Sequence, residues 1–160
     1  GVIFKDDIDA NYVSSTQLDS LKLINVNDFV ISLRSFQGGI EFSKIKGIVS
    51  PAYNIFHFRS GFDNSYFQTY YKYLFKTPQF ITLLNTIISG IRDGKNISYK
   101  DFSSLYLPIP DKETLNKVKY LDEKLEVYKQ ELNNEQLLIK EYIDSLIYYV
   151  VTGQLSVEKD

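Results

Sequence analysis

The pattern that decides the fold of this chain lies in residues 118–151, VKYLDEKLEVYKQELNNEQLLIKEYIDSLIYYVV. One apolar row recurs every seven residues, at Val118, Leu125, Leu132, Ile139 and Leu146. A second row lies three residues further on, at Leu121, Tyr128, Tyr142 and Tyr149, and only Glu135 interrupts it. Two apolar rows at alternating spacings of three and four residues predict a helix that pairs as a coiled coil.

The ends of this helix are also marked in the sequence. Asp111 is a good N-cap, and Gly153 favours a C-terminal stop. We therefore predict a helix over residues 111–154, about 60 Å long, with a short tail at 155–160. The tyrosines at Tyr128, Tyr142 and Tyr149 are bulky for a tight two-stranded seam. They favour a looser antiparallel pair or contact with a second protein.

Composition places the chain in a broad class. A length of 160 residues with 44% hydrophobic residues allows one domain with a real core plus an appendage. No run approaches the ~18 apolar residues that a membrane-spanning helix needs, and no signal peptide is visible. The chain has no cysteine, which excludes disulfides and thiolate metal sites. We expect a soluble, cytoplasmic protein. It also lacks methionine, which suggests a fragment or a processed chain.

The net charge of −2 conceals an uneven distribution. Residues 34–100 contain nine lysines and arginines against three acidic residues, whereas residues 111–160 contain seven against eleven. A basic globular part beside an acidic helix suggests a polyanion partner for the first and a protein partner for the second. Many domains with such a modest surplus bind no nucleic acid.

Residues 1–110 predict a small mixed α/β domain, so that the whole chain belongs to the α+β class. A buried strand is expected at 28–34 and a half-buried one at 53–58, with a chain break at 47–51 between them. Residues 64–75 are compatible with a helix. Thr77 and Pro78 mark the start of another, which we expect to end at Gly90. Ser98 is expected to cap a single turn through Phe102.

These pieces, in this order, resemble one half of the specificity subunit of a type I restriction-modification system. The resemblance rests on NDFVISLRSFQGGIE at 27–41, GIVSPAY at 47–53, ISYKDF at 97–102, LPIP at 107–110 and VTGQL at 151–155. It implies an α/β target recognition domain that reads half of a split DNA sequence, followed by a long spacer helix. In a complete subunit of this family two such helices pack antiparallel, so the resemblance implies that this helix pairs as an antiparallel coiled coil. It also implies that the subunit carries the methylation subunits, and through them the restriction subunit, to the site without doing chemistry itself.

The chain departs from the family in two respects. Family recognition domains usually have some tens of residues before the equivalent of residue 1, so strands of the sheet are expected to be missing. A full subunit also has two domain–helix units, and this chain has one. We therefore expect an excised fragment or a half-subunit that pairs through its helix, either with a second copy or with another chain.

Two groups of polar residues are the candidate DNA contacts. Arg34, Ser35 and Gln37 follow the first buried strand, and arginine and glutamine are the usual partners of guanine and adenine in the major groove. A solvated surface turn is the competing interpretation. The second group is the densest set of hydrogen-bond donors outside the helix and comprises Arg92, Lys95, Asn96, Tyr99 and Lys100. The competing interpretation of this group is an ordinary connecting loop.

Other features favour ordinary explanations. Four other basic residues are interpreted either as phosphate contacts or as solvated surface side chains; they are Lys44, Lys46, Arg59 and Lys72. The aromatic residues at 66–75 repeat at helical spacing, so core packing is favoured over base stacking. The single histidine, His57, cannot form a histidine metal site and is expected to be structural.

No enzyme class is indicated. The sequence has no recognisable nucleophile–base pair, metal-ligand spacing or glycine-rich cofactor loop, so we expect a non-catalytic protein without cofactors. The alternative to a DNA reader is a protein–protein adaptor whose helix docks a partner and whose globular part binds no nucleic acid.

Overall fold

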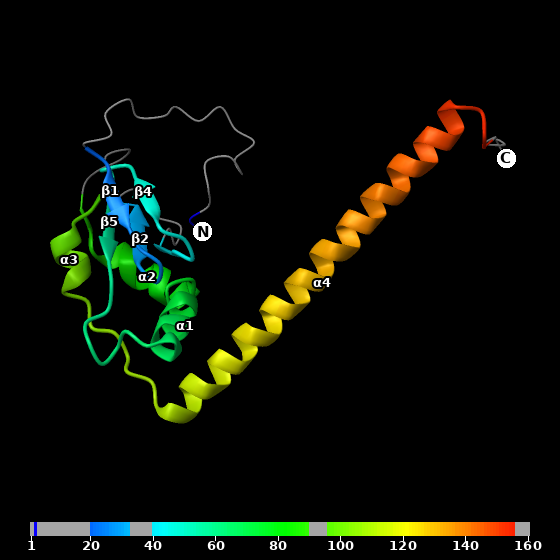
Figure 1. Cartoon of the computed structure of the whole chain (residues 1–160). Coiled ribbons are helices and arrows are strands. Elements are labelled where there is room, and N and C mark those ends of the chain that lie inside the picture. The colour runs from blue at the N-terminus through cyan, green and yellow to red at the C-terminus, as the bar shows by residue number, and fades with distance from the viewer. Residues whose placement is uncertain (1, 3–19, 33–39, 90–95, 156–160) are drawn as a thin grey trace. The chain divides into compact units, whose positions relative to one another are not determined.

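A computed structural model describes residue 2 and residues 20–32, 40–89 and 96–155; at 88–89 and 96–97 it describes the backbone alone. The chain divides into two compact units, Gly1–Val118 and Lys119–Asp160, here called the globular unit and the helical unit. Its class is α+β, as predicted: short antiparallel strands and helices, followed by a long C-terminal helix (Figure 1).

The described strands pair in three small antiparallel sheets. β2 (Phe29–Ser32) is the central strand of the largest, between β3 (Ile40–Phe42) and β5 (Tyr53–Phe56). β1 (Lys22–Ile24) pairs with β4 (Gly47–Val49), and β6 (Ile88–Ser89) pairs with β7 (Asn96–Ile97). The predicted strands at 28–34 and 53–58 correspond to β2 and β5, and residues 33–34 lie outside the described residues. The predicted break at 47–51 was wrong over its first three residues, because they form β4 against β1.

The described part of the globular unit has three short helices, and side-chain caps mark the starts of the first two. α1 (Ser65–Leu74) begins where the Asn64 side chain accepts from the amides of Tyr66 and Phe67. α2 (Pro78–Thr86) begins with Thr77, whose hydroxyl accepts from the Phe80 amide at 3.2 Å. It ends at Thr86 rather than at Gly90, because the chain enters β6. α3 (Tyr99–Ser103) follows Ser98, whose side chain makes no capping bond.

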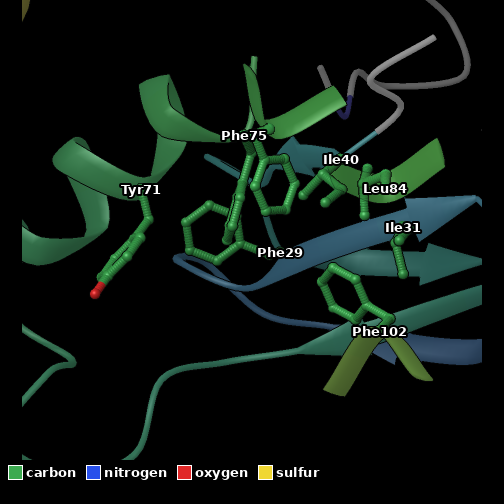
Figure 2. Packing of buried hydrophobic residues seen from close by; sticks show 8 residues of the cluster. Phe29, Ile31, Ile40, Tyr71, Phe75, Leu84 and Phe102 are labelled. Atoms are coloured by element: carbon green, nitrogen blue, oxygen red, sulfur yellow. The ribbon is translucent and has the colours of Figure 1, made fainter. Parts of the chain in front are cut away.

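The core lies between the three-stranded sheet and these helices (Figure 2). Phe29 and Ile31 of β2 alternate onto one face, where Phe29 packs edge-on against Phe75 at 5.4 Å between ring centroids. The cluster also takes side chains from β3, α2 and α3: Ile40, Phe80, Leu84 and Phe102. The aromatic run at 66–75 thus contributes to the core through Tyr71 and Phe75, as its helical spacing predicted.

The segment that leads into the long helix is fastened to this core. Leu105 and Leu107 pack against the cluster, and the Tyr71 hydroxyl donates a hydrogen bond to the Pro108 carbonyl at 3.0 Å. Burial raises the pKa of Tyr71. Asp111 then caps the helix, as predicted, because its Oδ1 accepts from the Thr114 amide at 2.7 Å. This hydrogen bond lowers the pKa of Asp111.

α4 (Lys112–Val151) is one continuous helix of 40 residues. It ends in a Schellman motif: the Gly153 amide donates to the Val150 carbonyl at 3.1 Å, and the Gln154 amide donates to the Tyr149 carbonyl at 2.9 Å. Gly153 has φ +73°, the left-handed conformation that glycine adopts at little cost, and this explains the predicted stop. Across the described residues, no helix is both long and apolar enough to cross a bilayer.

Candidate nucleic-acid interface and helix-pairing surface

The first predicted DNA-contact group falls on the connection between β2 and β3. These strands pair antiparallel, with Ile31 opposite Ile40. Arg34, Ser35 and Gln37 lie between them in sequence, outside the described residues. Their shared position is therefore a connection whose two ends are held together by the three-stranded sheet.

The second group begins on the connection between β6 and β7 and continues through β7 into α3. Ser89 lies opposite Asn96 across this strand pair, so residues 90–95 join two strand ends that are hydrogen-bonded to each other. Arg92 and Lys95 belong to this connection and lie outside the described residues. Asn96 is the first residue of β7.

Tyr99 and Lys100 are the two predicted contacts whose side chains the structure describes. Both are exposed and lie in the first turn of α3, two residues after β7. Tyr99 is 41% exposed, and its ring centroid lies 6.1 Å from that of Phe102, a buried residue of the core cluster that anchors α3. The first turn of α3 therefore presents an exposed aromatic ring and a cation shortly after β7 in the sequence.

A surface pocket of about 180 Å³ adjoins Tyr99. It lies where the end of β5, α3 and the segment after α3 meet, and it is lined by Phe56, His57, Phe58, Phe75, Tyr99, Phe102, Ser103, Leu105 and Leu107. Its lining is mainly apolar. No sequence pattern indicated this pocket. The alternation at 53–58 indicated a half-buried strand, but nothing in the pattern identified α3 as its neighbour.

The histidine of this pocket has an acidic neighbour. His57 is exposed, and its Nδ1 lies 3.9 Å from Oδ1 of Asp28. Asp28 is mostly buried and accepts a hydrogen bond from the Asn25 amide at 2.7 Å, so its carboxylate is held in the turn before β2. Within the residues that the structure describes, no group of three or more histidine, cysteine or acidic side chains could hold a metal ion.

The remaining basic side chains of the globular unit differ in their surroundings. Lys44, Lys46 and Arg59 are exposed, and the Arg59 guanidinium lies 5.8 Å from the centre of the Phe62 ring. Lys72 is half-buried, with its ammonium 5.0 Å from the centre of the Tyr73 ring.

One further lysine belongs to an ion pair that joins the end of α1 to β3. Lys76 pairs with Glu41. Burial raises the pKa of Glu41, the hydrogen bond and charge of Lys76 lower it, and the net shift is downward. Lys76 is therefore engaged within the fold.

The helix-pairing surface consists of the nine residues predicted from the heptad pattern, here called the stripe. Seven of them are exposed, and Val118 and Leu146 are half-buried; the exposed ones are Leu121, Leu125, Tyr128, Leu132, Ile139, Tyr142 and Tyr149. These seven residues have exposed fractions of 44% to 64%, so most of the stripe is exposed to solvent in the single chain. Leu115, at the start of α4, is the buried residue of the described helix.

The last third of α4 is apolar beyond the stripe. The additional exposed apolar residues there are Leu137, Leu138, Ile143, Ile147, Tyr148, Val150 and Val151. In heptad terms they occupy every flank of the helix, so a single two-stranded pairing would leave part of this surface uncovered. Large exposed apolar surfaces usually mark sites of protein contact.

Comparison with known proteins identified no relative, because no family model, curated protein or solved structure matches this chain.

Proposed function

We propose that this chain is a non-catalytic, sequence-reading DNA-binding protein of the type I restriction-modification specificity class. In this proposal the globular unit reads one half of a split duplex site. The helix α4 pairs with another helix and sets the spacing between two such readers. The methylation subunit, and through it the restriction subunit, are the proposed protein partners, and the cytoplasm is the expected location.

The observation that carries the proposal is the placement of the predicted DNA contacts. The first group lies on the connection between β2 and β3. The second begins on the connection between β6 and β7 and continues through β7 into the exposed first turn of α3. Strand connections of this kind project polar side chains from a rigid scaffold, which base reading requires. The exposed stripe of α4 supports the second half of the proposal, because a lone half-site reader gains affinity and a fixed spacing by being paired.

Binding to defined DNA by two variants tests the reading role. Arg92→Ala is expected to weaken binding to the preferred site by about 1–3 kcal/mol and to relax discrimination at one base position. Lys46→Ala removes an exposed cation elsewhere on the globular unit and is the matched control. It is expected to leave discrimination between bases unchanged. Equal losses on all sequences from Arg92→Ala would contradict a base-reading role for that residue.

The adaptor remains a second candidate because of one observation, the apolar character of the last third of α4 on all its sides. An adaptor would use this surface and α4 alone. Salt separates the two functions. Binding through phosphates weakens steeply as salt rises, whereas an apolar protein contact does not. An adaptor is therefore expected to show no salt-sensitive binding to duplex DNA at all.

A further inference from the structure

We propose that the surface pocket beside Tyr99 holds one unstacked base of the bound DNA. The inference deepens the proposed function and rests on it, because the base would come from the duplex that the globular unit reads. The starting observation is a pocket of about 180 Å³, which lies within the globular unit and is formed by β5, α3 and the segment after α3.

The walls of the pocket are largely aromatic. Phe56 lies 5.2 Å from Phe102 and 6.0 Å from Phe75 between ring centroids. The Tyr99 ring lies 6.1 Å from that of Phe102. Phe75 and Phe102 belong to the buried core, so the packing of the fold holds these walls in place (Figure 2). Proteins that bind unpaired nucleic acid stack its bases on aromatic side chains of this kind.

Size and polarity distinguish a base from a purely apolar occupant. An apolar cavity of roughly 150 Å³ accommodates one benzene molecule, so a surface pocket of about 180 Å³ has room for a single ring system. The lining also includes exposed residues with polar side-chain groups, namely His57, Tyr99 and Ser103. These groups can hydrogen-bond the edge of a nucleobase, whereas an aliphatic side chain offers them no partner.

The charge near the pocket suits a group that carries phosphate. Lys100 follows Tyr99 in the first turn of α3 and is exposed. Asp28, the acidic neighbour of His57, is mostly buried, and its carboxylate accepts from the Asn25 amide. An aromatic pocket followed by an exposed cation is the combination of stacking and charge with which proteins hold unpaired nucleotides.

Binding of free nucleotides to the full chain tests the pocket without duplex DNA. The probes are the four deoxynucleoside monophosphates, and saturation-transfer NMR on their base protons reports contact with the protein. Ser103 and Ser104 provide matched variants on α3. Both are exposed, and each hydroxyl donates to the carbonyl three residues earlier, at 2.9 and 2.7 Å. Of the two, only Ser103 lines the pocket.

Ser103→Phe replaces a small lining side chain by a ring, whereas Ser104→Phe adds the same ring outside the pocket. Nucleotide binding is expected to weaken about tenfold with Ser103→Phe, the loss of roughly one base–aromatic contact, and to stay at the wild-type level with Ser104→Phe. Tyr99→Ala and Tyr99→Phe are a second pair. The alanine variant is expected to weaken binding, and the phenylalanine variant to keep most of it. Urea unfolding of all these variants verifies their fold.

Two results would overturn the inference. The first is equal binding by the two serine variants, or no saturation transfer from the wild-type chain to any nucleotide. The second is saturation transfer to N-acetylphenylalaninamide but to none of the nucleotides, which would assign the pocket to an aromatic side chain of a protein partner.

The nucleotide test involves no duplex, so its failure is separable from failure of the reading role. A chain that selects a duplex motif but binds no nucleotide in the pocket would retain the proposed function and lose this inference. A chain that binds nucleotides in the pocket but selects no motif would retain the base site and lose the reading role.

Discussion

Tyr71 connects three parts of the globular unit at the scale of a single residue. Its ring stacks on Phe58 at 4.4 Å between centroids and on Phe75 at 5.9 Å, while its hydroxyl donates to the Pro108 carbonyl ahead of α4. The aromatic spacing predicted that Tyr71 would be buried. It did not predict the bond to Pro108, because the acceptor lies 37 residues away in the sequence.

Replacing Tyr71 by phenylalanine separates the ring from the hydroxyl. The loss of one hydrogen bond is expected to lower the free energy of unfolding by about 1 kcal/mol near neutral pH. The raised pKa of folded Tyr71 means that the folded state holds its proton more tightly than the unfolded state does. The stability that the neutral Tyr71 hydroxyl contributes is therefore fully present below the pKa of tyrosine in the unfolded chain, near 10. It is lost as the pH rises through the pKa of Tyr71 in the folded chain.

Urea unfolding followed by tyrosine fluorescence at pH 7, 10 and 11 would measure this effect. The difference between the wild type and Tyr71→Phe is expected to shrink at the alkaline end. A difference that stays constant across these pH values would contradict the assigned hydrogen bond.

Lys100 is the described residue best placed to report on phosphate contact. Lys100→Ala is expected to weaken DNA binding about equally on all sequences and to reduce the slope of log K against log salt by about 1. Lys140→Ala, an equally exposed charge deletion on α4, is the control and is expected to leave the slope unchanged. Equal slopes for Lys100→Ala and the wild type would show that Lys100 does not contact a DNA phosphate.

Element ends were the most predictable part of the fold, because caps are local. Thr77 with Pro78, Asp111 and Gly153 each marked an end where the structure has one. Elements that depend on distant partners were less predictable. Residues 47–49 were predicted to be a chain break because Gly47 and Pro51 both favour turns over regular secondary structure. They form β4 because β1 lies alongside, which the pattern of one segment cannot reveal.

The cap of α2 offers a test at the element scale. Thr77→Ala removes the acceptor for the Phe80 amide and is expected to cost about 1 kcal/mol of stability in urea unfolding. Thr82→Ala, an exposed change within the same helix, is the control and is expected to stay within about 0.5 kcal/mol. Equal losses from the two variants would show that the cap contributes nothing specific.

The stripe offers a second test at this scale. Leu132 and Leu137 are similarly exposed in the single chain, at 57% and 60%, but only Leu132 belongs to the stripe. Leu132→Glu is therefore expected to abolish pairing of the helix, whereas Leu137→Glu is expected to preserve it. Sedimentation of both variants at several concentrations measures the assembly state. An unchanged state for Leu132→Glu would show that the stripe assignment is wrong.

The whole molecule combines a globular unit, whose residues 34–100 carry a basic surplus, with a long helix whose apolar stripe is exposed. The α+β class and the helix followed from the sequence, because heptad periodicity and caps are repeated signals over many residues. The pocket beside Tyr99 did not, because it is made by β5, α3 and the segment after α3, which only the tertiary fold brings together.

Selection from a randomised duplex DNA pool, using the full chain at two salt concentrations, tests the central claim most directly. The account predicts enrichment of one short motif that occurs twice, at fixed spacing and as an inverted repeat, because a two-fold protein pair presents its readers symmetrically. Enrichment is expected to weaken at the higher salt. Absence of any motif at both salt concentrations, including salt-sensitive binding without sequence preference, would contradict the claim that this chain reads DNA sequence.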